Sequence, residues 1–122
     1  EKEILFDPYK IVKNSPIPIH AEFPMLPNLV DEVYDFAVRL NDIGVSHLLL
    51  DQVEFTNGNA EAMLKRGYQQ KNGVILGSEE AVFAVIDKIQ KNNLKIKALY
   101  CGSLNRKHQY KYVLTSPIFN SY

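Results

Sequence analysis

The chain has 122 residues, and its 14 basic and 14 acidic side chains leave a formal net charge of zero. This length predicts one domain, and the balanced charge argues against a bulk electrostatic binder of nucleic acid or of an acidic membrane. No apolar run approaches the roughly 18 residues that span a bilayer, and the charged first segment, EKEILFDPYK, lacks the apolar core of a signal peptide. With one cysteine, Cys101, an internal disulfide is excluded, so we expect a cytoplasmic protein.

The first elements along the chain are a weak helix and a strand. Residues 1–15 are expected to form a loop with a short helix over residues 8–13, ended by the loop signal Asn14-Ser15-Pro16. Residues 17–23 alternate between apolar and polar side chains, which is typical of a strand, although Pro16 and Pro18 fit only its beginning or an edge position. One face of this strand would carry Ile17, Ile19, Ala21 and Phe23, and the other Pro18, His20 and Glu22.

A long amphipathic helix and a buried strand follow. The apolar period predicts a helix over residues 29–43, with Asn28 as its N-cap and Gly44 as its C-terminal stop. Residues 45–53 form a continuous apolar run, which indicates a strand covered on both faces. His47 lies inside this run and is interpreted as a core histidine.

The second half of the chain continues with a short helix, a loop, a second long helix and a third strand. Asn59 is expected to cap a short helix over residues 60–66, which Gly67 ends, and residues 68–77 are expected to form a loop. Ser78 is interpreted as the N-cap of a second long helix that stops at Asn92-Asn93. Residues 94–100 then form a third strand, and the rest of the chain is poorly periodic.

This order of strands and helices predicts an α/β fold. Helices between strands imply crossover connections and a parallel sheet. Three parallel strands leave at least one edge open, so we interpret the chain as part of a (β/α) barrel, a TIM-like half barrel, or of an open sheet. The expected organisation is an N-terminal loop or short helix over residues 1–15, β/α units over residues 16–103 and a tail over residues 104–122.

Polar residues gather where the three predicted strands end. Because parallel strands bring their carboxyl ends to one edge, this cluster is expected at the edge where α/β proteins bind ligands. Alternatively, these side chains simply cap nearby helices and turns. The cluster comprises His20 and Glu22, then Asp51, Gln52 and Glu54, and finally Cys101.

Individual members of this cluster have both functional and structural interpretations. Glu22 is the best candidate to accept hydrogen bonds from a ligand hydroxyl or ammonium group; its structural alternative is an ion pair with Lys97 or Arg66. Cys101 is a candidate nucleophile or ligand, although a lone cysteine is more often a small apolar residue. One cysteine and three scattered histidines do not supply a zinc or iron–sulfur site.

Four motifs stand out along residues 16–109: HAEFPMLP from His20, DQVEFTNGNAEAMLKRG from Asp51, LGSEEA from Leu76, and YCGS from Tyr100 with Gln109 downstream. With these motifs the chain resembles the carboxy-terminal half of the radical S-adenosylmethionine superfamily barrel. More narrowly, it resembles the mainly archaeal proteins related to the pyruvate formate-lyase activating enzyme.

The resemblance implies a partial barrel that binds S-adenosylmethionine beside a [4Fe-4S] cluster in the complete protein. In the family, a Cys-x3-Cys-x2-Cys loop near the amino terminus holds the cluster, and this sequence contains no such loop. We therefore expect this chain to form the active-site wall opposite the cluster, to hold no metal and to be inactive alone. The residues that match family positions at the cofactor are Glu22, Glu54, Asn59, Arg66 and Cys101.

Three interpretations of the chain remain open. The chain is either a fragment or split half that joins the amino-terminal half of a barrel, or a non-catalytic half barrel that binds a small molecule. A purely structural module that associates with itself through open sheet edges is the third alternative. None of these interpretations involves nucleic acid or a membrane, and the substrate is unknown.

Overall fold

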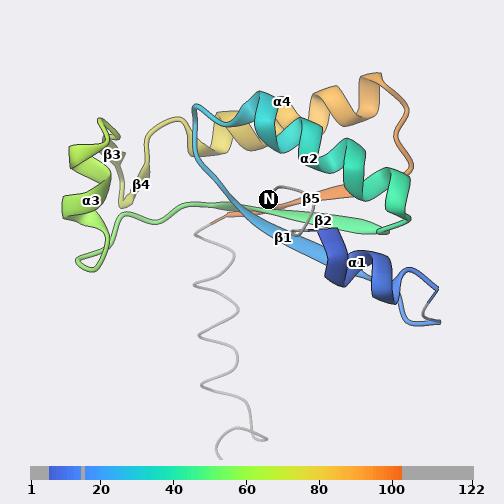
Figure 1. Cartoon of the computed structure of the whole chain (residues 1–122). Coiled ribbons are helices and arrows are strands. Elements are labelled where there is room, and N and C mark those ends of the chain that lie inside the picture. The colour runs from blue at the N-terminus through green and yellow to red at the C-terminus, as the bar shows by residue number, and fades with distance from the viewer. Residues whose placement is uncertain (1–5, 15, 103–122) are drawn as a thin grey trace, which may run out of the picture.

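The computed structural model describes residues 6–14 and 16–102, which form a three-stranded sheet with helices packed above it (Figure 1). The predicted tail, residues 104–122, lies outside the described residues, as does Ser103. In chain order the elements are α1 (Asp7–Val12), β1 (His20–Met25), α2 (Val30–Ile43), β2 (His47–Gln52), α3 (Ala60–Lys65), β3 (Gln70–Lys71), β4 (Val74–Ile75), α4 (Ser78–Lys91) and β5 (Lys97–Cys101).

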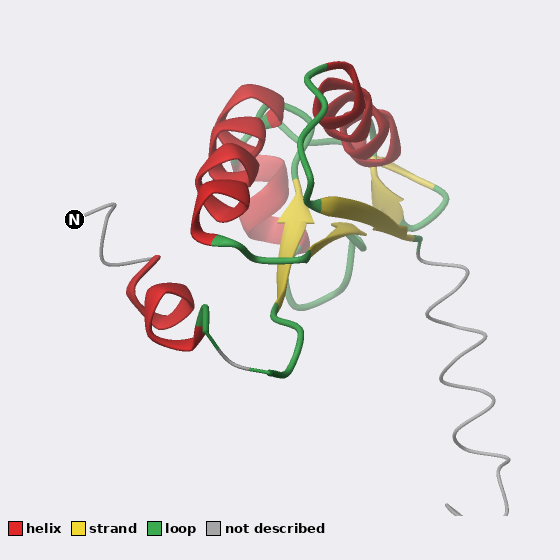
Figure 2. Cartoon of the chain, turned by 90° about the vertical axis from the view of Figure 1, so that its right-hand side faces the viewer, coloured by secondary structure: helices red, strands yellow, loops and turns green. Residues whose placement is uncertain are grey.

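The main sheet is parallel throughout and its strands follow the order β1-β2-β5. His20 lies opposite His47, which in turn lies opposite Lys97, so the three strands start together. Helices α2 and α4 both pack above this sheet, as the two views agree (Figures 1 and 2). The predicted α/β class with parallel strands is confirmed.

The core lies between the sheet and these two helices. Met25, Leu48 and Leu50 point from the strands into it and are fully buried. The helices meet them with apolar stripes at the spacing that the sequence predicts, and burial of such side chains is the main stabilising contribution to the fold. The buried positions of the two helices are Val33, Ala37 and Leu40 of α2 and Ala81, Val82, Val85 and Ile89 of α4.

Helix α1 lies outside this arrangement, against α2. The Phe6 ring packs on the Phe36 ring with centroids 5.1 Å apart, and the Arg39 guanidinium lies 5.0 Å from the Phe6 centroid. The short helix predicted over residues 8–13 is therefore present, one residue earlier. Its position follows from the Phe6 contact and from Tyr9, which is partly buried against the core, although no residue of α1 is fully buried.

The ends of α2 confirm one capping prediction and correct the other. Gly44 ends the helix with φ of 100°, a left-handed conformation that glycine adopts readily. Asn28 does not cap the start of the helix, because the N-cap position is occupied by Leu29, whose side chain makes no capping hydrogen bond. The Asn28 carboxamide oxygen instead accepts a hydrogen bond from the Tyr68 hydroxyl, which ties the β1–α2 loop to a distant segment.

The strands are shifted relative to their predicted positions. β1 begins at His20, three residues later than predicted, and runs through Pro24 to Met25. β2 is shorter than the apolar run 45–53, and β5 begins at Lys97 and not at Leu94. Apolar runs continue into the turns around a sheet, so hydrophobicity marks where a strand is and not where its ladder of hydrogen bonds begins.

The segment predicted as a loop, residues 68–77, contains a small antiparallel hairpin. β3 pairs with β4 across Asn72 and Gly73, which have φ of 54° and 82°. Asn-Gly with two positive φ values is the preferred two-residue hairpin turn, so this signal was present in the sequence and the loop prediction was wrong. Together with α3 the hairpin forms an excursion, residues 54–76, that projects beyond the ends of β1 and β2 (Figure 1).

Ser78 has a structural role that differs from the predicted N-cap. Gly77 occupies the N-cap position, with φ of 87°, and Ser78 is the first helical residue and fully buried. Its hydroxyl donates to the Met25 carbonyl at 2.7 Å and accepts the Val53 N–H at 3.0 Å. Ser78 therefore joins the carboxyl end of β1 to the residue that follows β2.

Over residues 6–14 and 16–102, the chain contains no helix that combines the length and the apolar character needed to cross a bilayer.

Candidate functional site

The two faces of the main sheet differ in what covers them. Side chains alternate along a strand, so the residues between the buried ones point away from α2 and α4. No helix or strand among the described residues packs against this second face (Figures 1 and 2). We call it the uncovered face, and its residues are His20, Glu22 and Pro24 of β1, His47, Leu49 and Asp51 of β2, and Lys97, Leu99 and Cys101 of β5.

The strand register arranges the uncovered face in three rows. The row at the carboxyl ends is Pro24–Asp51–Cys101, the middle row is Glu22–Leu49–Leu99, and the row at the amino ends is His20–His47–Lys97. Glu22 and Lys97 are exposed, and Leu99 is 47% exposed. The face therefore carries acidic groups toward the carboxyl ends and nitrogen bases at the amino ends.

Four residues of the predicted cluster, His20, Glu22, Asp51 and Cys101, lie on the uncovered face, but His20 is not at the carboxyl ends as predicted. It is the first residue of β1 and lies at the amino ends, because β1 starts and ends later than the sequence pattern indicated. Asp51 and Cys101 are opposite one another on β2 and β5, and Glu22 lies one row away on β1. Asp51 and Cys101 are half-buried. A carboxylate accepts hydrogen bonds from a hydroxyl or an ammonium group, so Glu22 and Asp51 are suited to bind such groups of a small molecule.

Gln52 does not belong to this group, although the sequence placed it there. Its side chain lies on the helix-covered side of the sheet, is only 9% exposed and accepts a hydrogen bond from the Tyr100 hydroxyl at 3.3 Å. The reason is the two-residue period of the strand, which turns Gln52 to the opposite face from Asp51.

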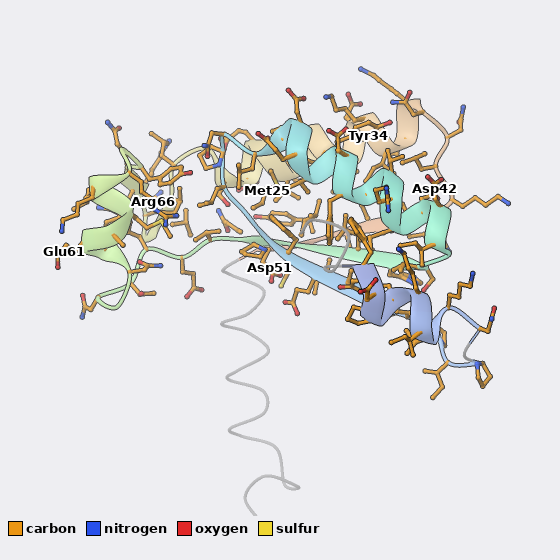
Figure 3. The ribbon with its side chains drawn as sticks, in the orientation of Figure 1. Met25, Tyr34, Asp42, Asp51, Glu61 and Arg66 are labelled. Atoms are coloured by element: carbon orange, nitrogen blue, oxygen red, sulfur yellow. The ribbon has the colours of Figure 1, made fainter. Side chains whose placement is uncertain are left out.

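The remaining predicted site residues lie in the excursion beyond the sheet. The Asn59 carboxamide donates to the Glu54 carbonyl at 2.9 Å and accepts the Thr56 N–H at 2.8 Å, so it holds the turn before α3. Glu54 itself forms an isolated bridge with Val74. Arg66 is exposed at the end of α3, apart from the labelled Asp51 at the sheet (Figure 3).

The structural alternatives to a binding role were an ion pair of Glu22 with Lys97 or Arg66 and the capping of nearby helices and turns. Within residues 6–14 and 16–102, no ion pair joins Glu22 to Lys97 or Arg66. Asn59 occupies the predicted N-cap position of α3 but makes no side-chain cap there. Its carboxamide instead organises the turn at Thr56. Among the described residues, no group of three or more His, Cys, Asp or Glu side chains is close enough to hold a metal ion.

The clearest electrostatic feature lies on the other side of the molecule. Lys88 of α4 donates to Asp31 of α2 at 2.7 Å, and this hydrogen bond raises the pKa of Lys88 above its ordinary value. The pair joins the outer surfaces of the two helices, so it contributes to helix packing and not to the uncovered face.

Sequence reasoning missed a histidine pair on the uncovered face. His20 and His47 occupy opposite positions on β1 and β2, and their ring centroids lie 4.4 Å apart. His47 is half-buried on the sheet surface, so its interpretation as a core histidine was wrong. The alternation of β1 already placed His20 on a polar face, but the pairing depends on the register between two strands, which the sequence does not specify.

The comparisons with known proteins add no relative: no family model, no curated protein and no solved structure matches this chain. The fold and the residues of the uncovered face are therefore the basis for a functional proposal.

Proposed function

We propose that this chain is the carboxy-terminal part of a radical S-adenosylmethionine barrel and that its uncovered face lines the barrel interior. The observation that carries the proposal is the consecutive strand order β1-β2-β5 with α2 and α4 on one face. In a (β/α) barrel, strands follow chain order, helices form the outer layer and the inner face of each strand points into the core. A doubly wound sheet would place helices on both faces.

The way in which all-parallel sheets pack in proteins also favours a second face that is covered. Such sheets occur almost only where both faces are packed against other parts of the protein. Leu49 and Leu99 form an apolar centre on the uncovered face, and Leu99 is 47% exposed. Strands from another segment would close the barrel over these two residues, which is why we assign the missing half to an amino-terminal segment or subunit.

The proposed active-site wall lies toward the carboxyl ends of the strands. There, Glu22 and Asp51 would accept hydrogen bonds from hydroxyl or ammonium groups of S-adenosylmethionine, with Cys101 beside them. The resemblance adds Glu54, Asn59 and Arg66 in the excursion as further residues at the cofactor. Asn59 would act there through the turn that it holds.

The residues of this chain do not fit the iron–sulfur cluster itself. A [4Fe-4S] cluster is held by several cysteine thiolates, and the sequence has one cysteine. The other half of the barrel would therefore supply the ligands and the cluster, and this chain alone would be inactive. The same observation favours a second candidate function, a non-catalytic half barrel that binds a small molecule or associates with itself.

The deciding experiment begins with the coding sequence upstream of Glu1. Where it encodes a Cys-x3-Cys-x2-Cys loop, the longer protein is expressed and its cluster reconstituted without oxygen, and cleavage of S-adenosylmethionine is measured. Glu22→Gln is expected to weaken cofactor binding or turnover while the fold persists. Glu32→Gln, an exposed carboxylate in the first turn of α2, is the matched control and is expected to have no effect.

Two results would remove the proposal. If neither the upstream frame nor a neighbouring gene encodes the cysteine loop, the radical function is excluded and the non-catalytic half barrel takes its place. If a reconstituted protein cleaves S-adenosylmethionine equally well with Glu22→Gln and Glu32→Gln, Glu22 has no part in the site.

A further inference from the structure

The amino-end row of the uncovered face contains a pair of imidazoles that no part of the proposed function uses. His20 and His47 stand side by side on β1 and β2, with ring centroids 4.4 Å apart and ring planes tilted by 45°. The geometry points to a binding site for one divalent transition-metal ion between these two rings. Because the pair lies at the opposite end of the strands from Asp51 and Cys101, this site is independent of the proposed cofactor wall.

The hydrogen bonds around Ser46 determine which nitrogen of His47 carries the proton. The Ser46 hydroxyl donates to the Ile19 carbonyl at 3.0 Å, and its oxygen lies 2.8 Å from His47 Nδ1. With its one proton directed at the Ile19 carbonyl, the Ser46 oxygen accepts from His47, and we assign the proton of this ring to Nδ1. His47 Nε2 is then the nitrogen with a lone pair, and a neutral imidazole with this arrangement is a ready metal ligand.

This arrangement is the one that metal-binding histidines use. Such histidines almost always donate their other ring N–H to a nearby oxygen, which sets the tautomer and orients the ring. Ser46 is itself held at the sheet, because its N–H donates to the Ile19 carbonyl at 3.1 Å and its carbonyl accepts the Lys97 N–H at 2.9 Å. His47 is therefore oriented in advance, whereas His20 is exposed and can rotate to complete the pair.

The spacing of the two rings suits a shared ion. With metal–nitrogen bonds of about 2.0–2.1 Å, two imidazoles on one tetrahedral ion have centroids about 5 Å apart. The His20 and His47 centroids lie 4.4 Å apart, and a small rotation of the His20 ring would widen this separation to that value. Since no third His, Cys, Asp or Glu joins the pair within the described part of the chain, water would fill the other positions of the ion.

The neighbouring side chains predict the class of ion. Two neutral nitrogen ligands favour Zn²⁺, Ni²⁺ or Cu²⁺ over Mg²⁺ or Ca²⁺, which prefer oxygen. Lys97 is the third member of the row and its positive charge opposes any cation, but its side chain is exposed and long enough to turn away. The affinity for the metal ion should therefore rise when Lys97 is replaced by a neutral residue. A bound ion would cross-link β1 and β2 at their amino ends.

The test titrates Zn²⁺ alone into the full chain and measures the heat of binding at neutral pH. We expect saturable binding of one ion, about tenfold weaker in His20→Ala and in His47→Ala and tighter in Lys97→Ala. Cys101→Ser and His108→Ala are the matched controls, since each removes a possible ligand elsewhere in the sequence and should leave the affinity unchanged.

A second measurement tests the role of Ser46 apart from the metal. Nitrogen chemical shifts of the metal-free protein should show His47 protonated at Nδ1, and Ser46→Ala should lose this preference and bind Zn²⁺ more weakly. The proposal is overturned if His47→Ala binds Zn²⁺ as the unaltered chain does, or if His47 is protonated at Nε2. Equal loss of binding in Cys101→Ser would move the ion to the carboxyl ends and also overturn it.

Discussion

The two faces of the same three strands have opposite surroundings. On one face Met25, Leu48 and Leu50 are fully buried under α2 and α4. On the other face Glu22 and Lys97 are exposed and Leu99 is 47% exposed. Both sets come from the same short segments, one residue apart, so the difference lies in what packs on each side and not in the strands themselves.

This contrast separates the part of the molecule that holds the fold from the part that is available for binding. The helix-covered face contains most of the apolar contacts, whereas Glu22, Asp51, Cys101 and the histidine pair lie on the uncovered face. Substitutions on the first face should therefore change stability, and conservative substitutions on the second should change binding alone.

The largest expected effect is that of Leu50→Ala, which removes a fully buried side chain from the core. The free energy of unfolding should fall by about 2–5 kcal/mol, through lost burial and the cavity that remains. Urea-induced unfolding followed by circular dichroism measures this change.

Leu99→Ala is the matched control on the uncovered face of the neighbouring strand. Its expected loss is below about 1 kcal/mol, because half of the side chain is already in water. A loss in Leu99→Ala as large as that in Leu50→Ala would mean that the uncovered face is packed in solution, and the contrast between the faces would fail.

A smaller effect is expected from Ser78→Ala, at the junction between the sheet and α4. This substitution removes the hydroxyl that forms hydrogen bonds with both the Met25 carbonyl and the Val53 N–H. Because Ser78 is fully buried, the loss should be about 1–3 kcal/mol, measured by the same unfolding experiment. The exposed Thr56→Ala is the control, and an equal change in both variants would show that Ser78 has no special structural role.

The smallest effect is expected from Asp31→Asn, on the outer surface of the covered side. The Asp31 hydrogen bond raises the pKa of Lys88 in the folded protein, so the pair stabilises the fold below the ordinary lysine value of 10.5 and loses this contribution as pH rises through the folded pKa. The melting temperature of Asp31→Asn should be slightly lower than that of the unaltered chain at neutral pH.

At a pH well above the folded pKa of Lys88, the two proteins should melt alike. A difference in melting temperature that persists there would show that Asp31 acts through something other than the charge of Lys88. Since the pair is exposed, salt should also reduce its effect at neutral pH.

The elements that depend on local patterns were predictable from the sequence. The apolar period of α2 and Gly44 at its end predicted that helix almost residue by residue. The alternation of β1 placed His20 and Glu22 on one face and Ala21 and Phe23 on the other, and the structure confirms this division. The hairpin between β3 and β4 was predictable as well, since Asn72-Gly73 is a strong turn signal.

The functions of Asn28, Ser78 and His47 were decided only by the tertiary structure. The sequence determined the α/β class, both long helices and the alternation of the strands, because these follow from side-chain periods and backbone preferences over a few residues. Only the folded chain brings Asn28 to Tyr68, Ser78 to the ends of β1 and β2, and His47 to His20. Each of these contacts joins residues at least 25 positions apart, and such pairing depends on strand register and helix docking, which no local pattern encodes.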